Sequence, residues 1–132
     1  MVNCNYENYG CMGGYLITSV DYLMVEGAVS NKCVPYTGTS EMCGYRCSDA
    51  GKTKYDKYYC KPGTISIAVT YDEIKRELIN NGPMLMGLQI MEDFMNYKSG
   101  VYKHVTGEVI GGHAMKVIGW GQDEKEGLYW EL

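Results

Sequence analysis

The 132-residue sequence is long enough for one domain of ordinary size, and its hydrophobic fraction of 45% is sufficient for a core. Its formal net charge of −4 gives no reason to expect nucleic acid or an anionic membrane as a partner. No apolar run approaches the length that spans a bilayer, so we expect a soluble chain with no membrane partner.

All six cysteines fall in the first half of the chain. They are Cys4, Cys11, Cys33, Cys43, Cys47 and Cys60. Only Cys43 and Cys47 are closely spaced, and no second tight pair or paired histidines complete a four-ligand zinc site, so we favour disulfides over metal. Disulfides imply an oxidising compartment, yet Met1 to Tyr6 have no signal-peptide character. The disulfides and the missing signal peptide are compatible if the chain is part of a longer precursor, or if its gene model begins too late.

The first half of the chain predicts one helix and long loops. Residues 1–15 are polar and glycine-rich and indicate a tight irregular loop. Apolar residues recur at helical spacing from Leu16 to Val25, and Gly27 is a suitable stop signal. Residues 28–63 have no sustained period, so we expect a loop region held by disulfides.

The second half predicts mainly strands. Thr64 to Val69 alternates as a short strand with Ile65, Ile67 and Val69 on one face. Thr70 and Glu73 form a capping box for a helix that buries Ile74, Leu78 and Ile79 and ends at Asn81-Gly82-Pro83. Met84 to Ile90 is predicted as a buried strand, Asp93 to Tyr97 as a helical turn, His113 to Ile118 as a buried strand and Leu128 to Leu132 as a final strand. The fold class is therefore α+β, with helical and sheet elements segregated along the chain.

His113 is the first candidate for chemistry, because histidine exchanges protons near neutral pH. Gly111 and Gly112 precede it and would let another backbone or a ligand approach closely. The competing interpretation is a histidine that only opens a core strand.

Several segments together resemble the papain-like cysteine peptidases, and most closely their cathepsin B-like branch. In chain order these segments are Asn3-Cys4, Gly10-Cys11-Met12-Gly13-Gly14-Tyr15, Pro35-Tyr36, Asn81-Gly82-Pro83, Tyr97-Lys98-Ser99-Gly100-Val101-Tyr102, His104-Val105-Thr106-Gly107-Glu108, Gly111-Gly112-His113-Ala114, Gly119-Trp120-Gly121 and Tyr129-Trp130. The resemblance covers nearly the whole chain and implies an incomplete two-lobe fold. Residues 1–63 would be the end of the helical lobe with disulfide-rich loops, and residues 64–132 the β lobe.

The resemblance also implies roles for individual residues. His113 matches the catalytic histidine, which holds a cysteine as thiolate and protonates the leaving amine. Gly13 and Gly14 match backbone that pairs with an extended substrate. Tyr15, Gly87, Gly112 and Ala114 match positions at or beside the S2 pocket, although Tyr15 and Gly87 are equally compatible with ordinary packing. The implied disulfides are Cys4–Cys43 and Cys33–Cys47, with Cys11 left free and Cys60 without a counterpart.

The chain departs from the family pattern at its catalytic centre. None of the six cysteines matches the nucleophile, and the orienting asparagine would follow Leu132, so we expect a fragment that is inactive alone. The short loop from Pro35 to Cys43 has no histidine, which implies an endopeptidase parent without an occluding loop. The implied parent acts on peptides or proteins in a lysosome or digestive vacuole or as a secreted enzyme, and the resemblance implies no cofactor. The alternatives are a non-catalytic, disulfide-rich binding module with the same fold and a cysteine-rich metal protein.

Overall fold

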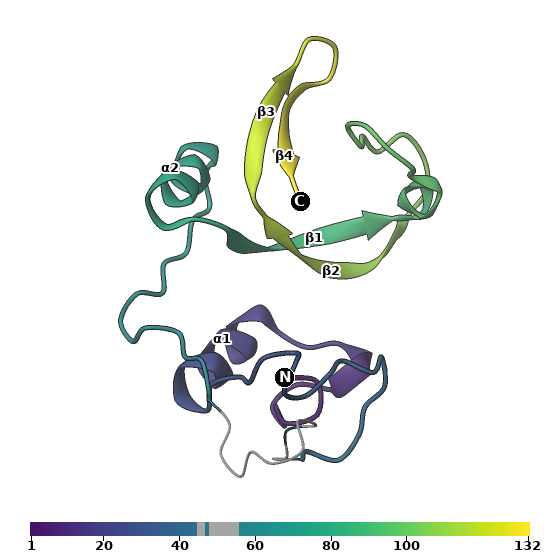
Figure 1. The fold of residues 1–132 in the computed structure, drawn as a ribbon. Coiled ribbons are helices and arrows are strands. Elements are labelled where there is room, and N and C mark those ends of the chain that lie inside the picture. Colours follow the sequence, from purple (N-terminus) through teal and green to yellow (C-terminus); the bar gives the residue numbers. More distant parts are fainter. Residues whose placement is uncertain (45–46, 48–55) are drawn as a thin grey trace. The chain divides into compact units, whose positions relative to one another are not determined.

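The computed structural model describes residues 1–44, 47 and 56–132, which form two compact units, Met1–Ile65 and Ser66–Leu132. Each unit has its own secondary structure, drawn in chain order from purple to yellow in Figure 1. Helices and antiparallel strand pairs are both present, so the α+β class is confirmed. No helix within the described ranges combines the length and apolar character needed to cross a membrane.

The first unit contains a short 3-10 helix, η1 (Gly10–Met12), and α1 (Leu16–Val25), which has the predicted bounds. The helix ends because the N–H groups of Glu26 and Gly27 both donate to Tyr22 O, at 2.8 and 3.1 Å. Gly27 has φ +70°, which glycine adopts without a Cβ penalty. The predicted stop signal is therefore confirmed.

Two disulfides hold the loops of the first unit. Cys4 bonds to Cys43 and Cys33 bonds to Cys47, the same two pairs that the resemblance implied. Cys11 and Cys60 are free. A single antiparallel bridge between Ala28 and Tyr58 joins the end of the loop region to the residues that follow α1. The covalent links fix chain segments that have little regular structure of their own.

The second unit begins with α2 (Tyr71–Asn81), whose start is fixed by the predicted capping box. Thr70 Oγ1 accepts from the N–H of Glu73 at 3.3 Å, and Glu73 Oε2 accepts from the N–H of Thr70 at 3.0 Å. Gly82, with φ +90°, ends the helix as expected. Ile74 and Leu78 are half-buried, but Ile79 is 72% exposed, so its predicted burial is wrong.

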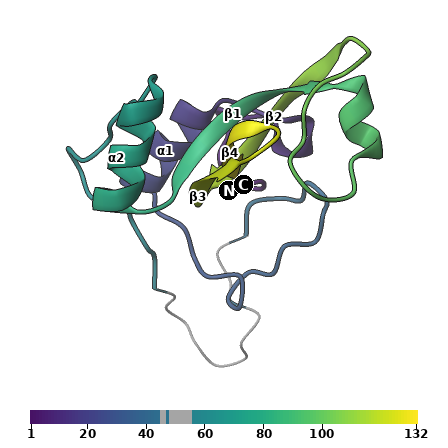
Figure 2. The same cartoon turned by 90° about the horizontal axis from the view of Figure 1, so that it is seen from above.

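Two separate strand pairs complete the second unit. The strand β1 (Met84–Met91) pairs antiparallel with β2 (Val109–Val117), and the connection between them includes the 3-10 helix η2 (Glu92–Asn96). A hairpin joins β3 (Gly119–Asp123) to β4 (Gly127–Glu131). Figure 2 shows both pairs from above. The sequence pattern did not predict β3, because Gly119 and Gly121 interrupt its apolar alternation.

The β1–β2 ladder has one half-buried face and one exposed face. Val117 is the one fully buried large side chain among the described residues, and it lies opposite Met84. Burial alternates along β1, whereas β2 is exposed from Val109 to Ala114. The expectation that both strands are buried is therefore wrong, because only one face of this two-stranded sheet is covered.

The predicted strand from Thr64 to Val69 is also wrong. These residues have no regular structure, and Ile67 and Val69 are 81% and 79% exposed. A β-prone alternation needs a neighbouring strand to satisfy its backbone, and the described residues offer none to this segment.

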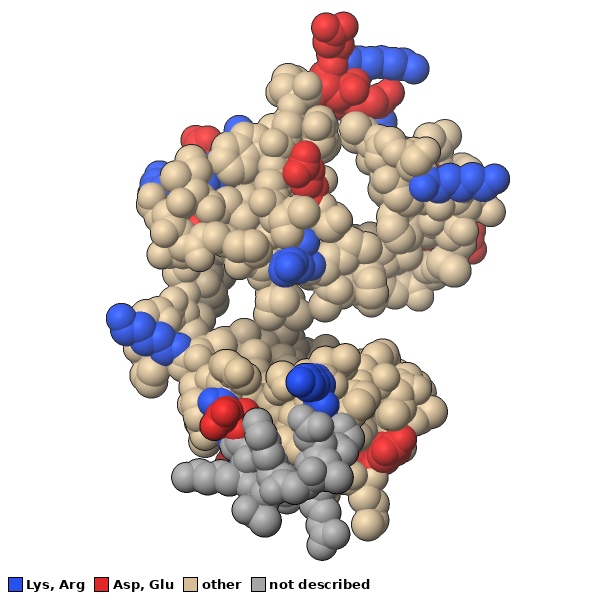
Figure 3. All heavy atoms as spheres, in the orientation of Figure 1, with Lys and Arg blue, Asp and Glu red and all other residues tan. Residues whose placement is uncertain are grey.

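Charged side chains are dispersed over the face shown in Figure 3, except at the turn between β3 and β4, where acidic residues gather. Asp123 accepts there from the N–H groups of Lys125 and Glu126, both at 2.8 Å. These hydrogen bonds lower the pKa of Asp123, with the Glu126 N–H contributing first. The carboxylate of Asp123 thus serves the turn itself.

Candidate active site

His113 occupies the fifth position of β2, directly opposite Leu88 of β1. Side chains that face each other in an antiparallel ladder lie on one side of the sheet. The imidazole therefore shares a side with Met86 and Met115, which are half-buried, but is itself exposed. Within the described part of the chain, no side chain hydrogen-bonds to the His113 ring, so the ring is available to an external group.

The two glycines before His113 leave space beside it. A Cβ added at Gly111 would meet nothing within 4 Å, and one at Gly112 would meet only Leu88 O at 3.9 Å. The ladder also changes register here, since Ile90 pairs with Gly111 while Met91 pairs with Val109. This irregularity places Ile110 outside the pairing and bends the strand just before the histidine.

Three predicted S2 residues lie on the other side of the same ladder. Gly87 pairs with Ala114, and Gly112 pairs with Gln89. Because successive strand residues point to opposite faces, Ala114 projects away from the side that carries His113. The structure thus places Gly87, Gly112 and Ala114 on rungs beside that of His113 but on the opposite face of the ladder, and their role in a substrate pocket stays a prediction.

Gly13, Gly14 and Tyr15 lie in the first unit, between η1 and α1. Gly13 has φ +104° and carries open space where a Cβ would stand. Tyr15 is 63% exposed and precedes the first helical residue. All three residues are exposed, and their pairing with a substrate backbone stays a prediction.

The loop before β2 is fixed by Asp93, a residue that the sequence pattern did not single out. Asp93 Oδ1 accepts from the hydroxyl of Tyr102 at 2.6 Å and lies 3.2 Å from His104 Nδ1. Oδ2 accepts from the N–H groups of Val105 at 2.8 Å and Thr106 at 3.2 Å. No sequence motif marks this arrangement, because the partners of Asp93 are separated from it along the loop.

These hydrogen bonds shift two pKa values. The Tyr102 hydroxyl, followed by the Val105 N–H, holds the pKa of Asp93 well below its usual range. Burial of the Tyr102 ring, together with its hydrogen bond to Asp93, raises the pKa of Tyr102 to about 12. His104 is therefore held in a structural network, which distinguishes it from the unpartnered His113.

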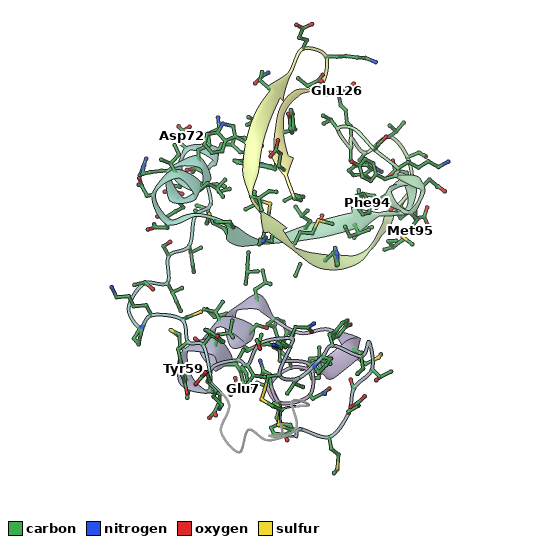
Figure 4. The ribbon with its side chains drawn as sticks, viewed as in Figure 1. Glu7, Tyr59, Asp72, Phe94, Met95 and Glu126 are labelled. Atoms are coloured by element: carbon green, nitrogen blue, oxygen red, sulfur yellow. A yellow bond between two sulfur atoms is a disulfide. The ribbon has the colours of Figure 1, made fainter. Side chains whose placement is uncertain are left out.

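An aromatic cluster supports the same loop. Phe94 packs edge-on against Tyr102, with ring centroids 4.9 Å apart, and stacks on Tyr97 at 5.6 Å. Figure 4 shows Phe94 on η2 beside Met95, which is 73% exposed. Polar and aromatic contacts together give the chain a defined path from β1 into β2, the strand that carries His113.

The cysteines of the described residues form no metal centre, and Cys11 and Cys60 are free thiols. Four of them are in disulfides. Among the described residues, no three or more His, Cys, Asp or Glu side chains are grouped so as to hold a metal ion. The geometry that remains is an exposed histidine on a glycine-flanked strand and an accessible glycine pair.

Comparison with known proteins explains this geometry. The family model of the papain family cysteine proteases matches residues 1–132, and the chain therefore belongs to that family. Its similarity is to the cathepsin B-like members. It is 34% identical over 94% of its length to Cathepsin B-like protease 1 of Arabidopsis thaliana and 33% identical over 92% to Cathepsin B of Dictyostelium discoideum. It spans 36% and 43% of those two proteins, respectively.

Solved structures of papain-like proteins are similar to this chain. A procathepsin B from Trypanosoma congolense superposes with a TM-score of 0.83 and 32% identity, over 98% of this chain and 45% of that one. A structure from a study of the mite allergens Blo t 1 and Der p 1 has a TM-score of 0.69 at 21% identity, covering 98% of this chain and 43% of that chain, and shows the shared fold. The incomplete papain-like fold predicted from the sequence is therefore confirmed.

Proposed function

We propose that this chain supplies the acid/base histidine and part of the substrate-binding surface of a cathepsin B-like cysteine peptidase. One observation carries the proposal. The ring of His113 is exposed on β2, has no partner among the described side chains and is preceded by two glycines that leave room for a reacting group. A histidine that served only the core would be buried or hydrogen-bonded.

In the proposed reaction, a cysteine thiolate attacks the carbonyl carbon of a peptide bond while the protonated His113 ring gives its proton to the departing amine. The C–N bond breaks and a thioester remains. Water then attacks the thioester, His113 accepts the water proton, and the carboxylic acid leaves as the thiolate is restored. Four cysteines of this chain are bonded in disulfides, and neither Cys11 nor Cys60 matches the family nucleophile, so we assign the thiolate to residues outside the chain.

Peptides or proteins bound in extended form are the proposed substrates, with Gly13 and Gly14 pairing to their backbone and Tyr15, Gly87, Gly112 and Ala114 at or beside a side-chain pocket. We propose an endopeptidase, since the loop from Pro35 to Cys43 has no histidine. The two disulfides support an oxidising location, such as a lysosome, a digestive vacuole or the outside of the cell. We also propose that the 132-residue chain alone does not turn over peptides, because catalytic groups act as a unit.

The test uses the full-length parent and a fluorogenic peptide amide. His113→Ala is expected to reduce kcat by at least about 100-fold, since general acid–base groups contribute on the order of 10²–10⁴. His104→Ala is the matched control, because it removes the other histidine while leaving the strand β2 intact, and it should retain activity once corrected for folded fraction. Wild-type protein without hydrolysis sensitive to a thiol-directed inhibitor would instead favour the non-catalytic binding module.

A further inference from the structure

The side chain of Asn8 is hydrogen-bonded through both of its polar atoms. Oδ1 accepts from the backbone N–H of Tyr15 at 2.8 Å and from the Thr18 hydroxyl at 2.6 Å. Nδ2 donates to Ser19 Oγ at 3.0 Å. Tyr15 precedes α1 and provides no side-chain cap. One half-buried amide therefore links the loop before η1 to the first turn of α1.

The same amide lies directly against Gly14. A Cβ at Gly14 would collide with the Cβ, Cγ and Oδ1 atoms of Asn8. On the preceding residue, Gly13 O accepts from the N–H of Tyr9 at 3.0 Å, while the Cβ position of Gly13 is open. Asn8 therefore contacts the glycine pair at Gly14, and Tyr9 binds it at Gly13. The space beside the Gly13 Cβ position is open.

The backbone polar groups of Gly14 are not used internally. Within the residues that the structure describes, neither its N–H nor its C=O makes a hydrogen bond. Backbone groups that have no internal partner and lie on an accessible segment can pair with an added extended chain. The direction of the Gly14 N–H and C=O groups depends on how the Gly14 backbone is held. Two interactions hold it, the contact with Asn8 and the hydrogen bond between Asn8 and Tyr15.

We propose that Asn8 is a positioning residue for substrate binding, which sets the direction of the Gly14 N–H and C=O groups that pair with the backbone of an extended peptide. This inference rests on the proposed peptidase function. It also explains the residue type, because Asn places two acceptor bonds and one donor bond on a single planar group. Aspartate would keep the bonds to Tyr15 and Thr18, whereas leucine has a similar size and would lose all three.

The test measures KM and kcat separately for a fluorogenic peptide amide in the full-length parent. Asn8→Leu is expected to raise KM about three- to tenfold, the range that follows from loss of a net hydrogen bond, and to change kcat less than about twofold. Asn8→Asp should keep KM within about twofold of wild type, since both acceptor bonds remain. Asn8→Ser is a second variant with a smaller side chain, which excludes steric crowding as the cause of any effect. We expect the same rise in KM for it.

Asn31 provides the matched control. Its Oδ1 accepts the N–H of Tyr36 at 2.9 Å in an exposed loop of the same unit, so Asn31→Leu removes a similar bond away from the glycine pair. Amide hydrogen exchange gives an independent readout, because Asn8→Leu should speed up exchange at Tyr15 and Asn31→Leu should not.

An active wild-type enzyme whose KM does not change in Asn8→Leu, or changes equally in Asn31→Leu, would overturn the inference about Asn8 and leave the peptidase function standing. Unchanged exchange at Tyr15 would overturn it as well. A wild-type parent without thiol-dependent hydrolysis would instead overturn the proposed function on which the inference rests.

Discussion

The hydroxyl of Tyr102 donates to Oδ1 of Asp93 at 2.6 Å, across nine residues of the connection between β1 and β2. The other carboxylate oxygen accepts two backbone N–H groups, from Val105 and Thr106. One carboxylate therefore links three residues of a loop that has no regular ladder, beside the aromatic contacts of Phe94. We therefore expect the order of this loop to respond to the charge of Asp93.

Acid is expected to loosen this loop. Since the pKa of Asp93 in the folded state lies below its ordinary value of 3.8, its contribution to stability is present above that value and is lost as pH falls towards the lower folded pKa. Amide hydrogen exchange at Val105 and Thr106, corrected for intrinsic rates, should speed up as the full-length parent is taken below about pH 4.

Asp93→Asn should show fast exchange at both amides already at neutral pH, with little further change on acidification. Asp72→Asn is the control, because Asp72 lies in the first turn of α2, away from the loop. The same pH response in the Asp93→Asn protein as in wild type would show that another group controls the loop.

Alkali is expected to act through Tyr102. The pKa of this phenol is about 12 instead of 10.0, so its contribution to folding is complete below about pH 10 and is lost as pH rises through about 12. Ring-carbon NMR of labelled tyrosine should show Tyr102 titrating near pH 12, above the ordinary tyrosine value of 10.0. Asp93→Asn should bring the pKa of Tyr102 down; an unchanged titration would mean that the carboxylate does not affect the phenol.

The start of α2 should depend on Thr70. Thr70→Ala removes the acceptor for the Glu73 N–H and is expected to reduce the free energy of unfolding by about 1 kcal/mol, within a range of about 0.5–2. Thr70→Ser keeps the acceptor and should recover most of this loss. Urea unfolding of the full-length parent measures both, and equal loss in the two variants would exclude the capping bond as the cause.

Val117 should be the least replaceable apolar residue of the β1–β2 ladder. It is fully buried opposite Met84, so Val117→Ala removes buried methyl groups and is expected to cost about 1–3 kcal/mol of unfolding free energy. Val105 is 83% exposed, and Val105→Ala should cost less than about 0.5 kcal/mol. Equal costs in urea unfolding would contradict the assignment of the core to Val117.

Local signals in the sequence were sufficient for the helices. The apolar period and Gly27 defined α1, and Thr70 with Glu73 defined the start of α2, because capping and stop signals act within a few residues. Burial was harder to predict. The pattern of apolar residues indicates which face of an element can be covered, but tertiary packing decides whether that face is covered. The faces predicted to be buried are in fact exposed at Ile67, at Ile79 and around His113.

Some residues of the candidate site could be recognised from the sequence, and others could not. His113 and the glycine pair were recognised from motifs, and the disulfide pairs followed from the family resemblance. Asn8 and Asp93 were missed, because each acts on backbone N–H groups several residues away and no side-chain pattern records that relation.

The two disulfides overlap along the chain, since Cys33 lies inside the loop closed by Cys4–Cys43 and Cys47 lies outside it. Any single cut of the backbone between Cys4 and Cys47 therefore leaves both pieces covalently joined. A protein cut once in this region is expected to run as one band in gel electrophoresis until its disulfides are reduced. Two bridges placed one after the other along the chain would leave an unprotected stretch between Cys33 and Cys43, and the overlap of the bridges closes that stretch.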